Sequence, residues 1–132
     1  MATMEVHLVT PEREVWTGRA QMVVAKGIDG MVGILPGHAP LLIRLAISEM
    51  KLQLEDGRWE FAVADGGFLH VTTSEEGTRV DILASHAQMA GEIDAVAAQA
   101  RVEELQRQLA QHADTAASVE LAKAHARANL RR

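Results

Sequence analysis

The composition of the chain changes abruptly at residue 91. All ten glycines, three prolines and four aromatic residues lie within residues 1–91, and residues 92–132 contain none of them. The second segment holds many alanines and equal numbers of acidic and basic side chains, so the net charge of -5 belongs to the first segment. Glycine and proline mark turns, whereas alanine is the strongest helix former. The two segments are therefore expected to fold differently.

Short apolar runs alternate with turn residues throughout the first segment. Alternating or β-branched runs cover residues 4–9, 21–25, 31–35, 50–55, 59–63, 68–72 and 78–84, and further short extended segments are expected at 14–16 and 41–45. Asp56-Gly57-Arg58 predicts a tight hairpin, and Asp65-Gly66-Gly67 is interpreted as a second connection between separate strands. Roughly eight to ten short strands without intervening helices predict an antiparallel β-sandwich or barrel over residues 1–88. The four aromatic residues are expected in its core.

Residues 89–132 predict a helical hairpin. Ala98, Val102, Leu105 and Leu109 recur at helical spacing, and so do Val119, Ala122, Ala126 and Leu130. Residues 111–114 form a short connection, with Asp114 as the expected N-cap of the second helix. An alanine methyl group buries little area, and at about 25 cal/mol per Å² such a face docks weakly. The predicted fold is α+β: an N-terminal antiparallel β-sandwich followed by a C-terminal antiparallel helical hairpin that can move.

Composition argues against several classes of function. The chain has no cysteine, which removes disulfides and thiolate chemistry, and no apolar stretch reaches the roughly 20 residues that cross a bilayer. Nucleic acid is a poor candidate partner because no basic cluster is present. The histidines lack the spacing of a metal site, and no group of residues has the pattern of an active site.

Residues 27–40 are rich in glycine but do not match a phosphate-binding loop. Their glycines are typical of bulges and tight turns, and Pro36 and Pro40 stiffen the turn around His38. We expect His38 to be exposed there. Two interpretations remain open: His38 is a contact residue, or it is an ordinary solvated loop histidine.

Three sequence motifs are similar to those of a known family. They are Gly-Met-Val-Gly-Ile-Leu-Pro-Gly-His-Ala-Pro-Leu-Leu at residues 30–42, Asp-Gly-Gly-Phe-Leu at residues 65–69, and Ile-Leu-Ala at residues 82–84. Together with the alanine-rich hairpin, they resemble the epsilon subunit of F-type ATP synthases over essentially the whole chain. The resemblance implies a non-catalytic rotor protein at the foot of the central stalk.

The resemblance also implies the partners. They are the gamma subunit, the c-ring and the catalytic alpha and beta subunits, with membrane contact only indirectly through the complex, on the cytoplasmic face of the bacterial plasma membrane or its plastid equivalent. The implied contact loop to the c-ring and gamma comprises Asp29, Met31, Pro36, Gly37, His38, Ala39 and Pro40. Met31 stands where the family often has an acidic residue, and nearby Asp29 is a possible substitute.

Some members of the family bind ATP through a pattern Ile-Asp-x-x-Arg-Ala at the start of the hairpin. The corresponding residues here are Ile93, Asp94, Ala97 and Ala98, with Ala97 at the arginine position. Losing this guanidinium removes a charged hydrogen-bond donor to phosphate worth about 1.5–3 kcal/mol, so ATP binding is expected to be weak or absent, and no cofactor is expected.

The extended hairpin in the family inhibits ATP hydrolysis. Arg101, Arg107, Lys123 and Arg127, with Arg131 and Arg132, can therefore meet an acidic surface of the catalytic subunits, or simply solubilise the helices. A different class of function is a free-standing β-sandwich ligand-binding module with a helical oligomerisation tail. A third, a small hydrolase, lacks an identified catalytic group.

Overall fold

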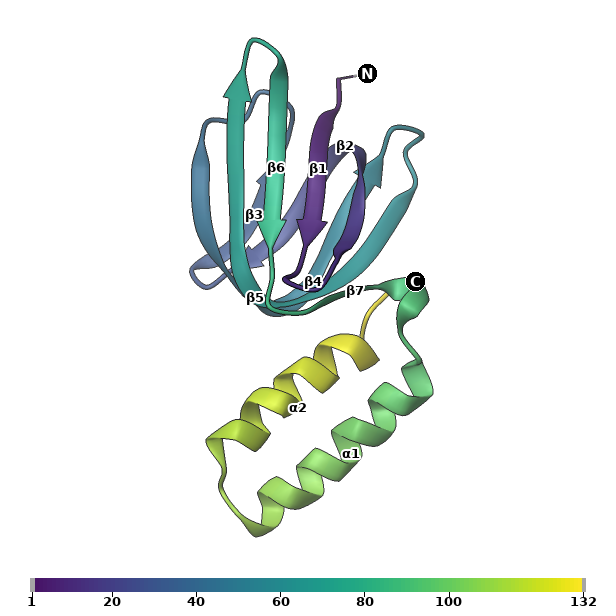
Figure 1. Ribbon diagram of the computed structural model, residues 1–132. Helices are drawn as coiled ribbons and strands as arrows, with labels where there is room; N and C mark the ends of the chain where they lie inside the picture. The colour runs from purple at the N-terminus through teal and green to yellow at the C-terminus, as the bar shows by residue number, and fades with distance from the viewer. Residues whose placement is uncertain (1, 132) are drawn as a thin grey trace.

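A computed structural model describes residues 2–131 and consists of a β-sandwich with a helical hairpin at one end (Figure 1). The strands are β1 (Met4–Val9), β2 (Glu14–Gly27), β3 (Gly30–Ile34), β4 (Leu41–Leu54), β5 (Trp59–Ser74), β6 (Gly77–Leu83) and β7 (Ala87–Met89). A short 3-10 turn, η1 (Ala90–Glu92), leads to α1 (Ala95–Gln111) and α2 (Thr115–Ala128). The predicted fold class is confirmed. The expected boundary between residues 88 and 89 falls inside β7.

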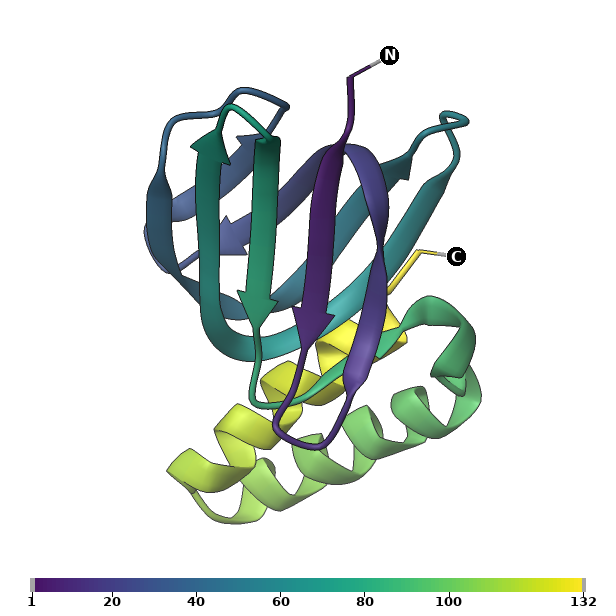
Figure 2. The ribbon, with the colours of Figure 1, turned by 45° about the horizontal axis from the view of Figure 1, so that its top comes forward.

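Five strands of the sandwich form a closed circuit of hydrogen-bonded neighbours, β1-β6-β5-β4-β2, which β1 completes by also pairing with β2. All but one of these pairs are antiparallel; β1 and β6 run parallel, with Glu5 opposite Arg79 and Val9 opposite Leu83. The purely antiparallel arrangement expected from the sequence is thus corrected at one pair. Figure 2 shows β1 between β6 and β2. Closure leaves these strands few free edges for pairing with another chain.

Fewer and longer strands are present than the sequence suggested. β2 joins the segments expected at 14–16 and 21–25, and β4 joins those expected at 41–45 and 50–55. β5 likewise joins 59–63 and 68–72, so Asp65-Gly66-Gly67 lies within a strand rather than between two strands. Both glycines have positive φ, +79° at Gly66 and +108° at Gly67, so β5 bends here without reversing. A Cβ at Gly67 would lie 2.1 Å from the carbonyl oxygen of Leu83. Glycine is therefore required by the close approach of β6, not by a turn.

The sandwich core is made by the inward faces of the alternating strands. In β1, for example, Met4, Val6 and Leu8 are fully buried while Glu5 is exposed. The buried members of this core are Met4, Val6, Leu8, Ala20, Val23, Ala25, Ile34, Leu45, Met50, Leu52, Ala62, Ala64, Leu69, Val71, Val80, Ile82, Ala84 and Ala87. The core is complete without any residue of α1 or α2.

The expectation that all four aromatic residues are buried is wrong. Trp16 and Phe61 are half-buried, and Trp59 and Phe68 are 38% and 46% exposed. The ammonium group of Lys51 lies 5.0 Å from the centre of the Trp59 ring, a cation–π contact that suits an exposed position. Phe68 is on the outward face of β5. Small and aliphatic side chains fill the core instead.

The hairpin has a small core of its own. Val102, Leu105 and Ala124 are buried in it, and Ala117, Leu121 and Ala128 pack around them. The expected face of α2 is corrected: Val119 and Ala122 are exposed. The apolar positions of α2 pack against two partners. One set faces α1, whereas Ala126, together with Leu130 beyond the end of the helix, faces the sandwich. The predicted N-cap is confirmed, since Asp114 accepts hydrogen bonds from the backbone of Ala116 and Ala117.

Candidate functional site

The turn carrying His38 is fixed by the neighbouring β5–β6 hairpin. Gly37 has φ +87°, and its N–H donates to the hydroxyl of Thr78 at 2.7 Å. The hydroxyl of Thr73 donates to the carbonyl of His38 at 2.6 Å, and the His38 N–H donates to the carbonyl of Leu35 at 3.0 Å. These bonds satisfy backbone N–H and C=O groups of a turn that has no regular secondary structure, and they hold the turn in one conformation.

His38 is half-buried rather than exposed, and its Nδ1 lies 2.7 Å from the carbonyl oxygen of Ala39. Ala39 and Pro40 beside it are exposed. The turn lies with the β5–β6 turn at the end of the sandwich opposite the helices (Figures 1 and 2). The turn is thus a rigid feature at the far end of the molecule from the hairpin.

Asp29 and Met31 are not brought together with this turn. Asp29 is in the β2–β3 turn, and β3 carries Met31 near its start and ends before Pro36. Five residues of strand span roughly 16 Å, so Asp29 does not supply an acidic group beside His38. Met31 and Leu42, both 65% exposed, instead help line a groove of about 330 Å³ next to the β2–β3 turn.

The residues of the degenerate nucleotide motif have structural roles. Asp94 is the N-cap of α1 and accepts a hydrogen bond from the N–H of Ala97 at 3.0 Å. Ile93 packs against the sandwich, while Ala97 is exposed and Ala98 half-buried. The carboxylate at position 94 is therefore engaged by the helix it starts.

The hairpin touches the sandwich mainly through α2, which lies against β4 and β5. A small apolar cluster forms this contact: Val63, Ala90 and Leu130 are buried, with Phe61, Ile93 and Ala126 packed around them. Few large side chains take part. Burial of apolar area alone accordingly contributes little to holding the hairpin in place.

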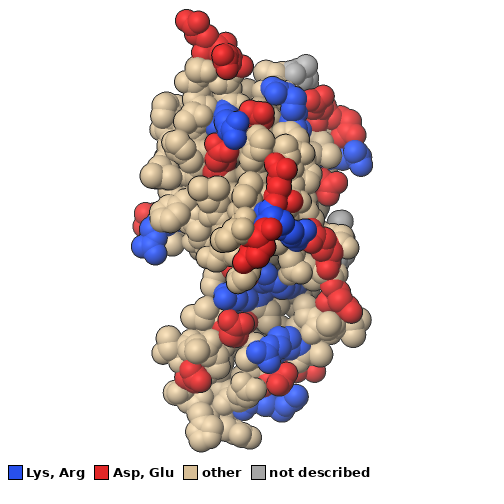
Figure 3. Space-filling view, viewed as in Figure 1, with Lys and Arg blue, Asp and Glu red and all other residues tan. Residues whose placement is uncertain are grey.

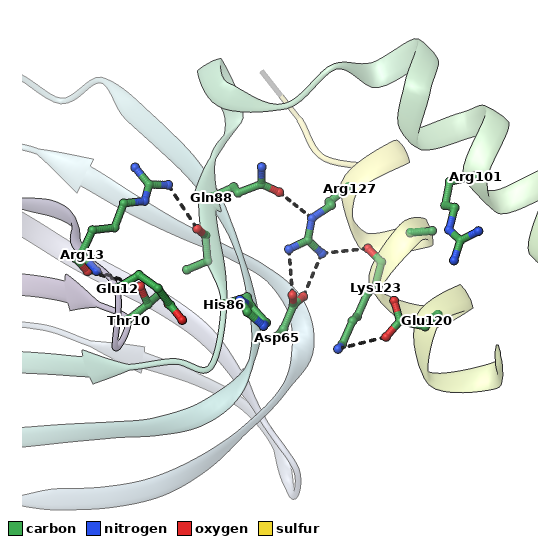
Figure 4. A pocket seen from close by; sticks show the side chains of 12 residues that line it. Thr10, Glu12, Arg13, Asp65, His86, Gln88, Arg101, Glu120, Lys123 and Arg127 are labelled. Carbon is green, nitrogen blue, oxygen red and sulfur yellow. Dashed lines mark hydrogen bonds and ion pairs between the residues drawn. The ribbon is translucent and has the colours of Figure 1, made fainter. Parts of the chain in front are cut away.

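An ion pair lies beside this cluster. The guanidinium of Arg127 on α2 donates from Nη1 and Nη2 to the two carboxylate oxygens of Asp65 on β5, each at 2.8 Å. Its Nε donates to the side-chain oxygen of Gln88 on β7 at 2.6 Å. Figure 4 shows Arg127 reaching across from α2 to both. The side chain of Asp65 is 3% exposed and that of Arg127 is 18% exposed.

The other basic residues of the hairpin are at its surface. Arg101 pairs with Glu104 at 3.2 Å, and Lys123 pairs with Glu120 at 3.3 Å. Arg107 is exposed. Arg131 reaches the sandwich and pairs with Glu49 at 2.6 Å, but its side chain is 61% exposed. Among these cations, Arg127 has the most enclosed contact.

Sequence reasoning missed the Asp65–Arg127 pair. The sequence placed Asp65 in a connection between two strands, and it placed Arg127 either at an acidic partner surface or on a solvated helix surface. One signal was available: Lys123 and Arg127 are four residues apart, which places two cations on one face of α2, and Arg131 follows just beyond the end of the helix. That face points to the sandwich, but the acidic partner is 62 positions away in the chain and only the fold reveals it.

A cleft of about 490 Å³ lies between the β1–β2 turn and α2, with the ion pair in its wall (Figure 4). It is lined by Thr10, Glu12, Arg13, Asp65, His86, Ala87, Gln88, Arg101, Glu120, Lys123, Ala124 and Arg127. The acidic groups in it are largely engaged by basic ones. Over residues 2–131, no group of side chains has the makeup of a metal site.

The outward face of β1, β2 and β6 carries exposed charge pairs. The Thr17 hydroxyl donates to the carboxylate of Glu14, and this bond, with help from His7, lowers the pKa of Glu14. Hydrogen bonds to Asp81 raise the pKa of Arg79. Such exposed pairs stabilise the fold little.

The charges are dispersed over the surface. Figure 3 shows acidic and basic side chains interspersed over both parts of the molecule, rather than one basic field on the face in view. In the described part of the chain, neither helix is long and apolar enough to span a bilayer.

Comparison with known proteins points in one direction. The family described as ATP synthase, Delta/Epsilon chain, beta-sandwich domain matches residues 3–90. The ATP synthase epsilon chain of Thermobifida fusca is 43% identical over 126 residues, covering 93% of this chain and 89% of the relative. That of Streptomyces coelicolor is 35% identical over 120 residues, covering 91% and 94%.

Solved structures share the fold. A chain of the Euglena gracilis mitochondrial ATP synthase, in its OSCP/F1/c-ring assembly, superposes with a TM-score of 0.79 over 95% of this chain and 79% of that chain, at 24% identity. A chain of the Tetrahymena thermophila central stalk and c-ring gives 0.53 at 19% identity over 69% of each. At these identities the likeness concerns the arrangement of strands and helices.

Proposed function

This chain belongs to the family of ATP synthase epsilon chains, and from that premise we propose that it is a non-catalytic subunit of the central stalk. It couples rotation of the c-ring to the catalytic head and regulates ATP hydrolysis through its C-terminal helices. Its partners are the gamma subunit, the c-ring and the catalytic alpha and beta subunits. The bacterial relatives support a peripheral position on the cytoplasmic face of the plasma membrane.

The observation that carries this proposal is the division into two separately packed parts. The sandwich has a complete core and a closed strand circuit, which suits a part that transmits torque without deforming. The hairpin has its own small core and a narrow contact with the sandwich. A rigid element attached by a narrow contact can shift between two positions when a partner binds one of them better.

The rigid turn at Pro36, Gly37, His38, Ala39 and Pro40 is the proposed contact with the c-ring. It is held by Thr73 and Thr78 at the end of the molecule away from the helices. The separate apolar groove beside Asp29 and Met31 suits gamma. The His38 turn lies away from the hairpin, so the hairpin can move without releasing this contact (Figure 1).

ATP is not the proposed regulator. The arginine position of the family's nucleotide motif is Ala97, and Asp94 already caps α1. Calorimetry with MgATP and the isolated chain should show weak or no binding. Tight binding would contradict this part of the proposal.

The deciding experiment compares complexes assembled with the full chain and with a chain lacking residues 92–132. The truncated chain should still bind gamma and support ATP-driven proton pumping, because the sandwich core and the turn remain intact. ATP hydrolysis by the detached catalytic sector should change. If the truncated chain fails to bind gamma, or if hydrolysis is identical in the two complexes, the proposed division of work is wrong.

The free-standing ligand-binding module has no supporting observation. The two exposed aromatic residues, Trp59 and Phe68, lie nine positions apart on β5, on either side of its bend, and do not share a flat face. The family assignment favours the rotor subunit instead.

A further inference from the structure

The ion pair between hairpin and sandwich stands out because it lies where the proposed movement must begin. We propose that Asp65 and Arg127 form the latch that holds the hairpin in the docked position. The sandwich thereby competes for the cationic face of α2 with any acidic surface that the released hairpin meets. This inference rests on the proposed movement of the hairpin.

The geometry of Arg127 is that of a fully engaged guanidinium. Both terminal nitrogens donate to Asp65, and Nε donates to Gln88. Gln88 and Asp65 come from adjacent strands, since Gln88 is opposite Val63 in the β5–β7 ladder. The sandwich thus presents three acceptor oxygens, two from Asp65 and one from Gln88, that match the donors of one planar guanidinium group. Bidentate pairs of this kind are stronger and more directional than single contacts.

Burial distinguishes this pair from the ion pairs of Lys123, on the same helix, and of Arg131, just beyond its end. Lys123 pairs with Glu120 of its own helix and therefore holds nothing to the sandwich. Arg131 does reach Glu49, but its side chain is 61% exposed, and exposed pairs contribute little. Because the side chains of Asp65 and Arg127 are only 3% and 18% exposed, solvent and salt screen their attraction less than that of the other two pairs.

The latch also accounts for a carboxylate in an otherwise apolar part of β5. Asp65 follows the buried run Ala62, Val63 and Ala64, and the two hydrogen bonds from Arg127 on α2 offset the cost of enclosing its charge. Undocking returns both groups to water, so the pair can open without leaving a buried charge behind. The docked population then depends on the strength of this one contact.

The test uses thiol labelling of the isolated full chain. Because the chain has no cysteine, a single introduced thiol reports alone. Val63 and Ala62 are adjacent on β5 and both are 0% exposed, but Val63 faces the hairpin and Ala62 faces the sandwich core. Val63→Cys therefore reports undocking of the hairpin, and Ala62→Cys reports opening of the sandwich.

In the Val63→Cys background, Asp65→Asn or Arg127→Gln should speed labelling about 10- to 100-fold, as expected for losing a charged hydrogen-bonded pair. The matched control Glu49→Gln, which removes the exposed pair with Arg131, should change the labelling rate by less than about fivefold. The double variant should be no faster than the quicker single one, because both remove the same contact. Labelling in the Ala62→Cys background should stay unchanged.

The latch is refuted if Asp65→Asn acts no more strongly than Glu49→Gln, or if the effects of the two single variants multiply. If Asp65→Asn also loosens the sandwich itself, Arg127→Gln decides, because it leaves the sandwich sequence intact; unchanged labelling at position 63 in that variant overturns the proposal. None of these measurements needs the assembled ATP synthase. A failed latch is thus distinguishable from a failure of the hairpin to regulate hydrolysis.

Discussion

Replacing Gly67 by alanine tests whether the bend of β5 is fixed by contact with β6. The structure places the added Cβ 2.1 Å from the carbonyl oxygen of Leu83 and 2.7 Å from the Cα of Ala84. Both are backbone atoms of a segment that leaves β6, so no side-chain rotation relieves the overlap. Gly67 also has φ +108°, a conformation that alanine adopts only under strain.

The expected loss of stability is the sum of two effects. Backbone strain at such a φ costs about 1–3 kcal/mol. Forcing β6 aside to admit the methyl group costs a further 1–3 kcal/mol, roughly as for overpacking of a core. Gly67→Ala should therefore lower the free energy of unfolding by about 4 kcal/mol, within a range of roughly 2–6 kcal/mol.

Two other glycines separate these effects. Gly77 has φ +119° but nothing within 4 Å of its added Cβ, so Gly77→Ala should show the strain alone, about 1–3 kcal/mol. Gly33 has neither a positive φ nor a close neighbour, and Gly33→Ala should leave stability within about 1 kcal/mol of the parent, on the stabilising side.

Urea unfolding followed by tryptophan fluorescence measures all three variants, because Trp16 and Trp59 both lie in the sandwich. With a slope of about 2 kcal/mol per molar urea, Gly67→Ala should move the midpoint down by about 2 M. Equal losses for Gly67→Ala and Gly77→Ala would show that the approach of β6 is not what requires glycine, and would refute the explanation of the bend.

Three smaller changes test the hairpin and the surface. Leu105→Ala removes the largest side chain fully buried between the helices and should destabilise the hairpin by about 2–3 kcal/mol, seen as earlier loss of helical circular dichroism on heating. Asp114→Ala should cost about 1 kcal/mol by the same assay, with Asp114→Asn close to the parent. Thr17→Val should raise the pKa of Glu14 toward its ordinary value in an NMR titration. Because the pKa of Glu14 is lower in the folded state, its hydrogen bond to Thr17 stabilises the fold above the ordinary pKa of glutamate, and this stabilisation is lost as pH falls through the lowered value. Thr17→Val should therefore destabilise the fold at neutral pH and not at strongly acidic pH.

Features with local causes were predictable from the sequence. Asp114 caps α2 because its side chain bonds backbone groups two and three residues away. Gly57 has φ +88° in the β4–β5 hairpin, as expected for an Asp-Gly turn. The change from a strand pattern to a helix pattern near residue 91 likewise appears in the structure, because it depends on propensity and periodicity within short windows.

Features with distant causes were not predictable. Gly66 and Gly67 look like a turn, but whether two glycines with positive φ reverse a strand or bend it depends on β6. α2 packs against α1 with one face and the sandwich with another, so a single helical spacing could not identify both. In the sequence, Arg127 is indistinguishable from an ordinary surface cation. It becomes enclosed because the fold places Asp65 opposite it.

The parallel pairing of β1 with β6 has a consequence for how the chain is made. Glu5 pairs with Arg79, so the strand circuit cannot close until nearly all of the sandwich has been synthesised. Pairings this far apart in sequence form slowly, whereas helices form within about a microsecond. Residues 92–132 emerge after the sandwich, at roughly 5–20 residues per second. During those seconds the finished sandwich exposes Val63 and Asp65, and a nascent chain stalled at this point would present an uncovered docking surface to other proteins in the cell.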